Sequence, residues 1–169
     1  MKTRTATEAD LPRIVDLYNI AVATRMSTAD TEPVSLESRV SWFRERNHET
    51  RPIWVMETDG LVVGWLSFQP FHERPAYYIT AEISVYVAPD YRQRGIGRSL
   101  LSEAIHRGPE HGLRTLIGLV FKHNTPSIQL FGGVGFTVWG ELPTVADMDG
   151  IDRDLIIMGR HLKDHDSSP

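Results

Sequence analysis

The sequence predicts one α/β domain built on a mixed β-sheet. The 169 residues suit a single domain that can bury a sizeable core. Hydrophobic residues make up 41% and charged residues 24%, which are ordinary values for a globular protein. The apolar patterns follow the order strand, two helices, three strands, helix, strand, helix, two strands, and this order favours a mixed sheet over a regular βαβ array. We expect one domain over residues 1–162 and a flexible tail over residues 163–169.

Two helices are expected in the first 50 residues. Thr7 is an N-cap candidate, and the acidic residues that follow it suit the helix dipole. Ser35 is the second N-cap candidate, and its helix should end near Asn47. Apolar residues recur at helical spacing after both caps, at Leu11, Ile14, Val15, Leu17, Tyr18 and Ala21, and again at Leu36, Val40 and Phe43.

Three strands should follow these helices. Apolar runs at residues 52–56 and 61–68 flank Asp59-Gly60, which is a strong hairpin signal. A loop rich in proline and aromatic residues precedes the third strand, at residues 80–88.

The rest of the chain predicts two more helices and three more strands. Gly108-Pro109 should end or kink the first of these helices, on which one apolar face is formed by Leu100, Leu101, Ala104 and Ile105. A second helix over residues 125–134 should be closed by Gly135. The predicted strands cover residues 115–121, 136–142 and 155–158.

Composition excludes several classes of function. A net charge of −4 gives no broad basic field, so we expect neither nucleic acid nor an anionic membrane as a partner. The absence of cysteine removes disulfides, thiolate metal sites and a cysteine nucleophile. The sequence shows neither a signal-peptide pattern nor an apolar stretch of 18 residues, and we expect a cytoplasmic protein. We expect no metal, because no His-Glu-x-x-His occurs and His161 and His165 share a suitable spacing only near the end of the chain.

The segment Arg92-Gln93-Arg94-Gly95-Ile96-Gly97 lies where a strand gives way to a helix. The first N–H groups of such a helix are unpaired and favour an anion, while glycines allow close approach and arginines add charge. A P-loop would need Lys after Gly97, where Arg98 stands, and a dinucleotide fingerprint would need glycine at Leu100. The spacing therefore indicates a phosphorylated ligand held in another way, or else a plain glycine turn between solvated arginines.

In its context this segment resembles the acetyl-coenzyme A motif of the GNAT acetyltransferase superfamily. Residues 124–131, followed by Gly135-Phe136, resemble the second signature of that family. The resemblance implies a GNAT fold, with a mostly antiparallel mixed sheet, about four helices, and strands that splay apart at the acetyl-CoA site. It implies that the pyrophosphate lies on the backbone N–H groups of Gln93, Arg94, Gly95, Ile96, Gly97 and Arg98. It also implies that the pantetheine arm meets Val85, Tyr86, Val87, Asn124 and Ser127.

The chain further resembles the phosphinothricin acetyltransferase branch of this superfamily. The shared features are residues 7–12, Tyr18-Asn19, residues 30–33, Arg39 with Trp42-Phe43, and residues 81–87. The resemblance implies acetylation of the amino group of a small amino-acid-like substrate, such as phosphinothricin, methionine sulfoximine or methionine sulfone. It also implies a homodimer, in which residues 145–153 could reach the neighbouring subunit.

Acetyl transfer needs a neutral amine, a polarised carbonyl group and a proton for the leaving thiolate. The branch places its general base at the position of Glu82, which could otherwise be half of an ordinary ion pair. Backbone N–H groups near Val85 would polarise the carbonyl, because a strand that splays from its neighbour frees them. Phe131 stands where related enzymes have Tyr or His, so the thiolate leaves unassisted or takes its proton from Tyr86, Ser127 or water.

The loop after the second strand of the hairpin should bind the acceptor. The candidates are Phe71, His72, Arg74 and Tyr78. Arg74 could form a bidentate pair with the α-carboxylate of the acceptor, or it could be an ordinary surface arginine. Related enzymes use an arginine where this chain has His72. Met26, Ser27 and Thr28 could line the same pocket, whereas Trp42 and Phe43 are more simply core residues. Two alternatives remain: a peptide or protein acetyltransferase with an open groove, and a noncatalytic protein that binds acyl-CoA as a sensor.

Overall fold

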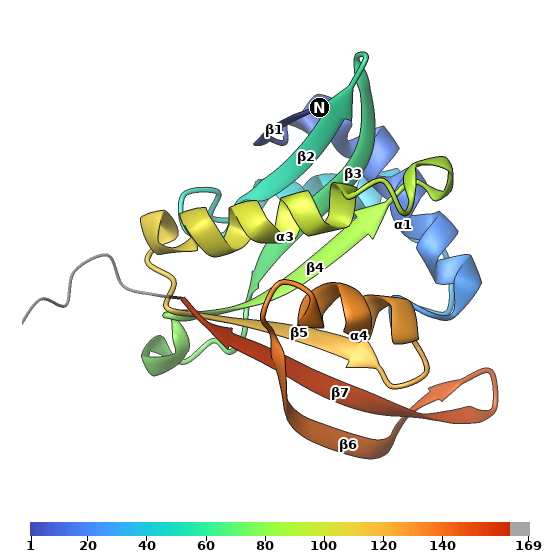
Figure 1. Ribbon diagram of the computed structural model, residues 1–169. Coiled ribbons are helices and arrows are strands. Elements are labelled where there is room, and N and C mark those ends of the chain that lie inside the picture. The colour runs from blue at the N-terminus through green and yellow to red at the C-terminus, as the bar shows by residue number, and fades with distance from the viewer. Residues whose placement is uncertain (163–169) are drawn as a thin grey trace, which may run out of the picture.

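The computed structural model describes residues 1–162, so the predicted tail at 163–169 and His165 lie outside the described residues. A seven-stranded sheet in the order β1-β2-β3-β4-β5-β7-β6 forms the centre of the protein, with helices on both faces (Figure 1). The strands are β1 (Lys2–Thr5), β2 (Ile53–Thr58), β3 (Leu61–Pro70), β4 (Thr80–Val87), β5 (Thr115–Phe121), β6 (Thr137–Met148) and β7 (Ile151–His161). The helices are α1 (Leu11–Thr24), α2 (Leu36–Arg44), α3 (Ile96–Arg107) and α4 (Thr125–Gly132).

The sheet divides in two between β4 and β5. All other neighbouring strands are antiparallel, whereas β4 and β5 are parallel and pair only from Thr80 with Thr115 to Glu82 with Ile117. Both strands continue beyond this point, β4 for five residues to Val87 and β5 for four residues to Phe121. The strands therefore splay apart after Glu82, as the resemblance predicted.

Each face of the sheet has its own hydrophobic core. The front core, under α3 and α4, includes the fully buried Leu100, Leu116 and Phe68. The rear core, under α1 and α2, includes Leu11 and Ile53. The α3 and α4 helices lie in front of the sheet in Figure 1 and α1 lies behind it. Within residues 1–162, no helix is long and apolar enough to cross a membrane.

Most predicted elements are present, with shifted ends. Asp59 and Gly60 form the expected hairpin turn, with φ angles of 52° and 76°. Thr7 and Asp10 form a capping box on a short 3₁₀ turn, and α1 itself begins at Leu11. The second helix ends at Arg44 rather than near Asn47, and α4 ends at Gly132.

The last two strands are much longer than predicted. β6 and β7 form one hairpin that turns at Asp149 and Gly150, where both φ angles are positive. The apolar pattern found only residues 136–142 and 155–158, because most of β6 is exposed and its outer half carries little apolar periodicity.

Candidate functional site

The start of α3 presents a group of free backbone donors. Ser99 is the first residue of α3 whose N–H finds an acceptor at the helix start, the carbonyl of Gly95 at 2.9 Å. No group in residues 1–162 accepts a hydrogen bond from the N–H groups of residues 93–98. Gln93 and Gly95 both have left-handed φ angles, 59° and 81°, which turn this segment into the helix. Free donors at a helix N-terminus form an anion site.

Gly95 and Gly97 are favoured over other residues for different physical reasons. A Cβ at Gly95 would meet nothing within 4 Å, so glycine is favoured there by the positive φ. A Cβ at Gly97 would lie 3.0 Å from Leu130, so glycine lets α3 pack closely against α4. The close approach of α3 to Gly64 in β3 was not predicted from the sequence. A Cβ at Gly64 would lie 2.9 Å from the side chain of Ile96. A glycine inside a strand was the available signal for this close approach.

The splay leaves one edge of β4 without a neighbouring strand. Ala88 donates to the carbonyl of Val63 across the β3–β4 pair. Backbone polar groups of a strand alternate in direction, so those of Val85 and Val87 point away from β3 and toward the gap. β5 pairs with β4 no further than Glu82. The gap therefore offers unpaired N–H and C=O groups beside the free donors of α3.

The arginines in the glycine segment and the one directly after it, Arg98, have different surroundings. Arg92 is exposed, and the guanidinium of Arg94 lies over the Tyr91 ring, 5.1 Å from its centre. Arg98 donates to the carbonyl of Gly133 at the end of α4, at 3.1 Å. Arg98 thus contributes its backbone to the donor group and its side chain to α4.

Asn124 is 5% exposed and both polar atoms of its side chain have protein partners. Oδ1 accepts from the N–H of Ser127 at 3.2 Å and so caps α4. Nδ2 donates to the carbonyl of Met26 at 2.9 Å, which ties α4 to the loop after α1. One N–H of the amide remains available for a ligand.

Phe131 is a core residue and 4% exposed. Its ring packs edge to face against Phe136, with the ring centres 5.0 Å apart. The ring also fills the space over Gly118 in β5, where a Cβ would lie 2.5 Å from Cε1. Phe131 therefore fixes the spacing of α4 and β5.

Glu82 lies at the last paired position of β4, where the gap begins. Its carboxylate has no hydrogen-bond or ion-pair partner in residues 1–162, so the ion-pair alternative is not what the structure contains. Burial raises the pKa of the Glu82 carboxyl. An unpaired carboxylate with a raised pKa at a break in the sheet has the properties of a general base.

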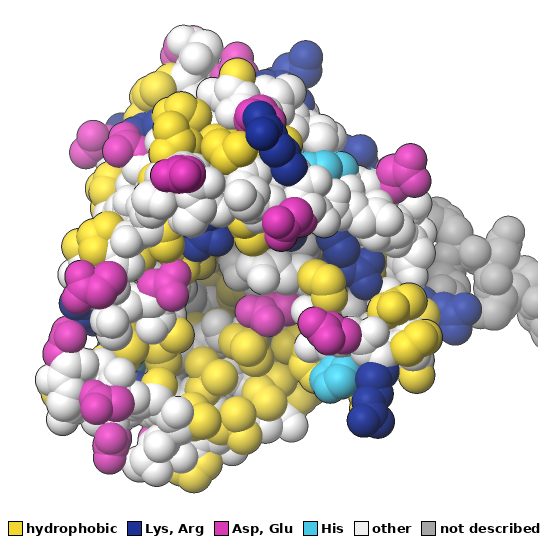
Figure 2. Space-filling model, turned by 180° about the vertical axis from the view of Figure 1, so that it is seen from behind, with side chains coloured by type: hydrophobic (Ala, Val, Ile, Leu, Met, Phe, Trp, Pro, Cys, Tyr) yellow, Lys and Arg dark blue, Asp and Glu magenta, His cyan; other side chains and the backbone are white. Residues whose placement is uncertain are grey.

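A cluster of aromatic and cationic groups lies on the same side of β4 as Glu82. Tyr86 stacks on Trp65 at 4.6 Å and meets Tyr18 edge to face at 5.3 Å. Arg39 lies 4.6 Å from the Tyr18 ring centre and 4.9 Å from that of Trp42. Burial raises the pKa of Tyr86, which stays protonated. Figure 2 shows this rear face hollowed near its centre, with acidic and hydrophobic side chains around the recess.

Two arginines that the sequence did not predict, the half-buried Arg46 and the buried Arg51, hold the strand ends beside Glu82. Arg46 donates to the carbonyls of Arg51 and Phe68, and Arg51 donates to the carbonyl of Tyr78 at 2.7 Å. Burial lowers the pKa of Arg46 to about 10, with repulsion from Arg39 and Arg51 adding to the effect. Neither arginine has a carboxylate partner in the described chain. No sequence motif marks them, because their acceptors are backbone carbonyls.

Two polar side-chain atoms on the rear side of β3 have no partner in residues 1–162. They are Nε1 of Trp65 and Oγ of Ser67, and both residues are almost fully buried. Ser67 lies opposite Ser84 in the register of β3 and β4. An unpaired buried donor is costly, so these atoms favour a polar ligand or water beside them.

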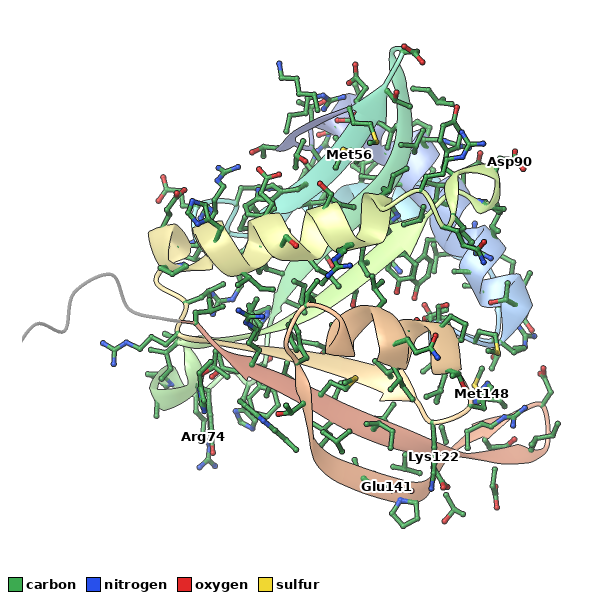
Figure 3. All side chains as sticks on the ribbon, in the orientation of Figure 1. Met56, Arg74, Asp90, Lys122, Glu141 and Met148 are labelled. Atoms are coloured by element: carbon green, nitrogen blue, oxygen red, sulfur yellow. The ribbon has the colours of Figure 1, made fainter. Side chains whose placement is uncertain are left out.

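The loop between β3 and β4 is exposed throughout. Phe71 meets Tyr77 edge to face, and His72 lies 5.2 Å from the same ring. Tyr78 is 56% exposed. Arg74 has no ion-pair partner in the described chain, and Figure 3 shows its side chain directed away from the sheet. Residues 1–162 contain no group of three or more His, Asp or Glu side chains able to hold a metal ion.

Comparisons with known proteins agree with this geometry. The model of the acetyltransferase (GNAT) family matches residues 14–136. A Bacillus subtilis (strain 168) protein, YwnH, provisionally named a phosphinothricin acetyltransferase, is 46% identical over 163 residues, covering 96% of this chain and 99% of that protein. The L-methionine sulfoximine/L-methionine sulfone acetyltransferase of Salmonella typhimurium (strain LT2) is 32% identical, covering 98% and 96%.

A solved structure adds a bound acyl donor. The GNAT superfamily phosphinothricin acetyltransferase from Sinorhizobium meliloti, in complex with acetyl-CoA, is 30% identical and has a TM-score of 0.89, covering 95% of this chain and 88% of that one. The family model covers well over half of this chain, and the splayed strands and free donors of α3 are those that the family resemblance implied. The chain therefore belongs to the GNAT family of acetyltransferases.

Proposed function

We propose that this protein transfers an acetyl group from acetyl-CoA to the amino group of a small amino-acid-like substrate. The observation that carries the proposal is the position of Glu82, an unpaired carboxylate at the point where β4 and β5 separate. The methionine sulfoximine and phosphinothricin acetyltransferases among its relatives support this acceptor class. We also propose a cytoplasmic location, because acetyl-CoA is an intracellular metabolite.

The backbone would hold the cofactor. The free N–H groups of residues 93–98 fit the pyrophosphate, and the open edge at Val85 and Val87 fits the amide groups of the pantetheine arm. The remaining amide N–H of Asn124 is available to the same arm. Bound acetyl-CoA would supply the thioester carbonyl, and a backbone N–H near Val85 would donate to its oxygen.

Glu82 would take a proton from the substrate's ammonium group, directly or through water, so that the neutral amine can attack. Tyr86, Ser127 or water would return a proton to the thiolate. Tyr86 stays protonated because burial raises its pKa. Phe131 has no proton to give and lies in the core.

The acceptor would lie on the rear side of the sheet beside Glu82. Phe71, His72, Arg74 and Tyr78 are proposed to border it, with Arg74 as the partner of an α-carboxylate. Arg39 is a second candidate for that carboxylate. Its guanidinium lies among aromatic rings near Tyr86, and its only acidic neighbour in the described chain is Asp30, at 3.8 Å.

The test is release of the CoA thiol from acetyl-CoA with a panel of acceptors. Phosphinothricin, methionine sulfoximine and methionine sulfone should give saturable turnover, whereas polyamines and short peptides should give little. Arg74→Gln and Arg39→Gln, made separately, should identify the carboxylate partner as the one that raises the acceptor KM and leaves the acetyl-CoA KM unchanged. Turnover on peptides alone would reassign the protein to the peptide acetyltransferases, and tight CoA binding without turnover on any acceptor would favour the sensor.

We further propose a homodimer formed through the rear face of β5, β7 and β6. Leu119 and Leu142 are 41% and 40% exposed there, and the register places them on the same side as Ile157 and Leu155. Exposed apolar patches of this kind commonly mark protein interfaces.

Leu142→Asp should therefore shift the protein from dimer to monomer in light scattering at micromolar concentration. Val138→Asp is the matched control, because Val138 is 58% exposed but pairs with Met158, which faces the front core. A monomeric wild type, or equal effects of the two variants, would contradict this interface.

A further inference from the structure

Arg39, Trp42 and Arg46 form one stripe along α2 and the turn that follows it. Residues three or four positions apart lie on the same side of a helix, and Trp42 stands between the two arginines at these spacings. The Cζ atoms of Arg39 and Arg46 lie 4.9 Å and 4.7 Å from the centre of the Trp42 ring. Arg39 and Arg46 are therefore two cations held beside one aromatic ring, and together they are the arginine pair.

The stripe faces the side of the sheet that carries Glu82. Trp42 meets Trp65 of β3 edge to face, with the ring centres 6.4 Å apart, and Trp65 stacks on Tyr86 of β4. Tyr86 and Glu82 are four residues apart in the same strand, so their side chains project from the same face. The arginine pair thus lies on the rear side of the sheet, where the acceptor is proposed to bind.

Arg46 reaches the level of Glu82 along the sheet. Its guanidinium donates to the carbonyl of Phe68 in β3. Phe68 pairs with Ile83, the residue directly after Glu82 in β4. One end of the arginine pair is therefore beside the proposed base, and the other end is beside the aromatic rings around Tyr86.

Little negative charge from the protein neutralises the arginine pair. The side chain of Arg39 is only 19% exposed, yet none of its N–H groups donates a hydrogen bond to an acceptor in residues 1–162. Its one carboxylate neighbour within 4.0 Å in that part of the chain is Asp30, at 3.8 Å, and Asp30 already accepts from the Tyr18 hydroxyl at 2.5 Å. Arg46 bonds only backbone carbonyls in the described chain.

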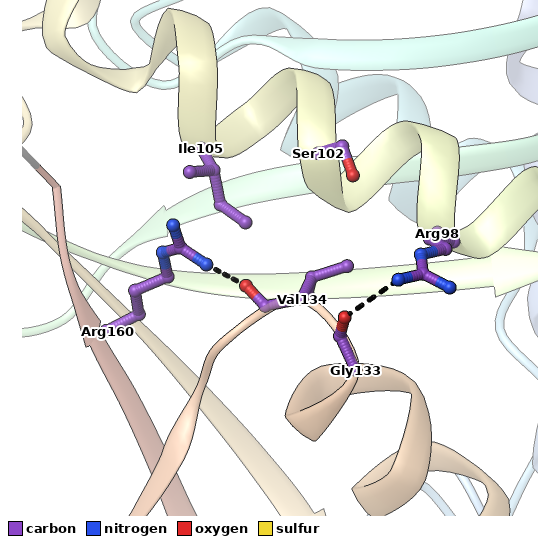
Figure 4. Close-up of a pocket in the computed structure, with 6 residues that line it drawn as sticks. All are labelled: Arg98, Ser102, Ile105, Gly133, Val134 and Arg160. Carbon is purple, nitrogen blue, oxygen red and sulfur yellow. Dashed lines mark hydrogen bonds between the residues drawn. The ribbon is translucent and has the colours of Figure 1, made fainter.

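Other arginines of the protein use their N–H groups more fully. Figure 4 shows the exposed Arg98 and the half-buried Arg160, each of which donates to a backbone carbonyl at the end of α4. Within the arginine pair, by contrast, burial lowers the pKa of Arg46 to about 10, and repulsion from Arg39 adds to the effect. Two partly buried cations that repel each other favour an anion beside them.

The neighbouring polar groups also suit an anion. Nε1 of Trp65 and Oγ of Ser67 lie on the same side of β3 and have no partner in residues 1–162. An indole N–H can only donate a hydrogen bond, and a guanidinium has no acceptor atom. Apart from Glu82, which is proposed to take the proton of the amine, the surroundings therefore favour an oxyanion over a second cationic group.

We propose that the arginine pair binds an acidic group at the end of the acceptor's side chain, so that the preferred acceptor is an amino acid with a second negative charge. This inference rests on the proposed function and on Arg74 as the partner of the α-carboxylate. Phosphinothricin and methionine sulfone are matched probes, because both side chains end in a tetrahedral centre with one methyl group and two oxygens, and only the phosphinate is charged. Charge-assisted hydrogen bonds should make kcat/KM roughly ten- to a hundredfold higher for phosphinothricin.

Steady-state kinetics of the full chain with these two acceptors tests the inference. Arg39→Gln should raise the KM for phosphinothricin and leave kcat/KM for methionine sulfone nearly unchanged, so that the preference is largely lost. Arg39→Lys keeps the charge and should restore part of it. Arg44→Gln is the matched control, because Arg44 lies on the same helix, is 65% exposed and pairs with Glu8 at the surface. This control should leave the preference at the wild-type value.

The wild-type preference is itself a test that needs no variant. Equal kcat/KM for the two compounds, or a higher value for methionine sulfone, would overturn this inference and leave the proposed function in place. An equal loss on both acceptors in Arg39→Gln would assign Arg39 to the α-carboxylate and would also overturn it. Tight CoA binding without turnover on any acceptor would overturn the proposed function as well.

Discussion

Replacing Glu82 with glutamine should lower kcat by about 10²- to 10⁴-fold, the range that general base catalysis contributes. Glutamine keeps the size of the side chain but cannot accept the ammonium proton. The backbone groups proposed to hold the cofactor lie on β4 and at the start of α3, so the affinity for CoA should stay within about twofold of wild type. Steady-state kinetics with the best acceptor, together with CoA titration, separates the two effects.

The control for this variant is Glu45→Gln. Glu45 is exposed after α2 and has no ion-pair or hydrogen-bond partner for its side chain in the described chain. This change should leave kcat unaltered. If Glu82→Gln also turns over at the wild-type rate, the proton leaves by another route and Glu82 is not the base.

The pH dependence gives an independent check on the same residue. Burial raises the pKa of the Glu82 carboxyl above its ordinary value of about 4.3. The base works only when it is ionised, so kcat/KM should fall as the pH drops through this raised pKa and level off above it. The residual activity of Glu82→Gln should lack this acid limb, and an unchanged limb would assign the ionisation to another group or to the substrate.

The sequence predicted the parts of the site that depend on the backbone. The glycine segment indicated the free donors of α3, because glycines between a strand and a helix favour a tight turn that leaves the first helical N–H groups open to a ligand. The splay after Glu82 came only from the family resemblance, since β4 and β5 both continue as regular apolar strands and no local pattern marks where their pairing ends.

Long-range packing could not be predicted in the same way. The sequence indicates only that Phe131 cannot supply a proton. The position of its ring over Gly118 depends on how α4 crosses β5. Arg98 is expected from the resemblance to offer only its backbone N–H to the pyrophosphate, and the hydrogen bond from its side chain to the Gly133 carbonyl spans 35 residues. Arg46 and Arg51 bond backbone carbonyls, which carry no sequence signal. Contacts of this kind become visible only when the fold is known.

The second large effect is expected on stability. Gly118→Ala should lower the free energy of unfolding by about 1–3 kcal/mol, the usual cost of inserting a methyl group into a tightly packed core. The added Cβ would lie 2.5 Å from Cε1 and 2.9 Å from Cζ of Phe131. The ring cannot move aside freely, because it is 4% exposed and packs against Phe136. Urea unfolding of wild type and variant measures the difference.

Gly132→Ala is the matched control, because Gly132 lies in α4 and an added Cβ would meet nothing within 4 Å. It should leave stability unchanged or raise it by up to about 1 kcal/mol through helix propensity. The double variant Gly118→Ala/Phe131→Leu should be more stable than the sum of the two single effects predicts, because a smaller side chain relieves the clash. Strict additivity would mean that the two residues do not press on each other.

The consequence for function follows from what α4 carries. Asn124 and Ser127 lie on the first turn of this helix, and Asn124 also bonds the loop after α1. A methyl group that pushes Phe131 outward would displace α4 from β5 and so widen the gap proposed to hold the pantetheine arm. Gly118→Ala should therefore raise the KM for acetyl-CoA more than the KM for the acceptor, although neither Gly118 nor Phe131 is proposed to contact either substrate.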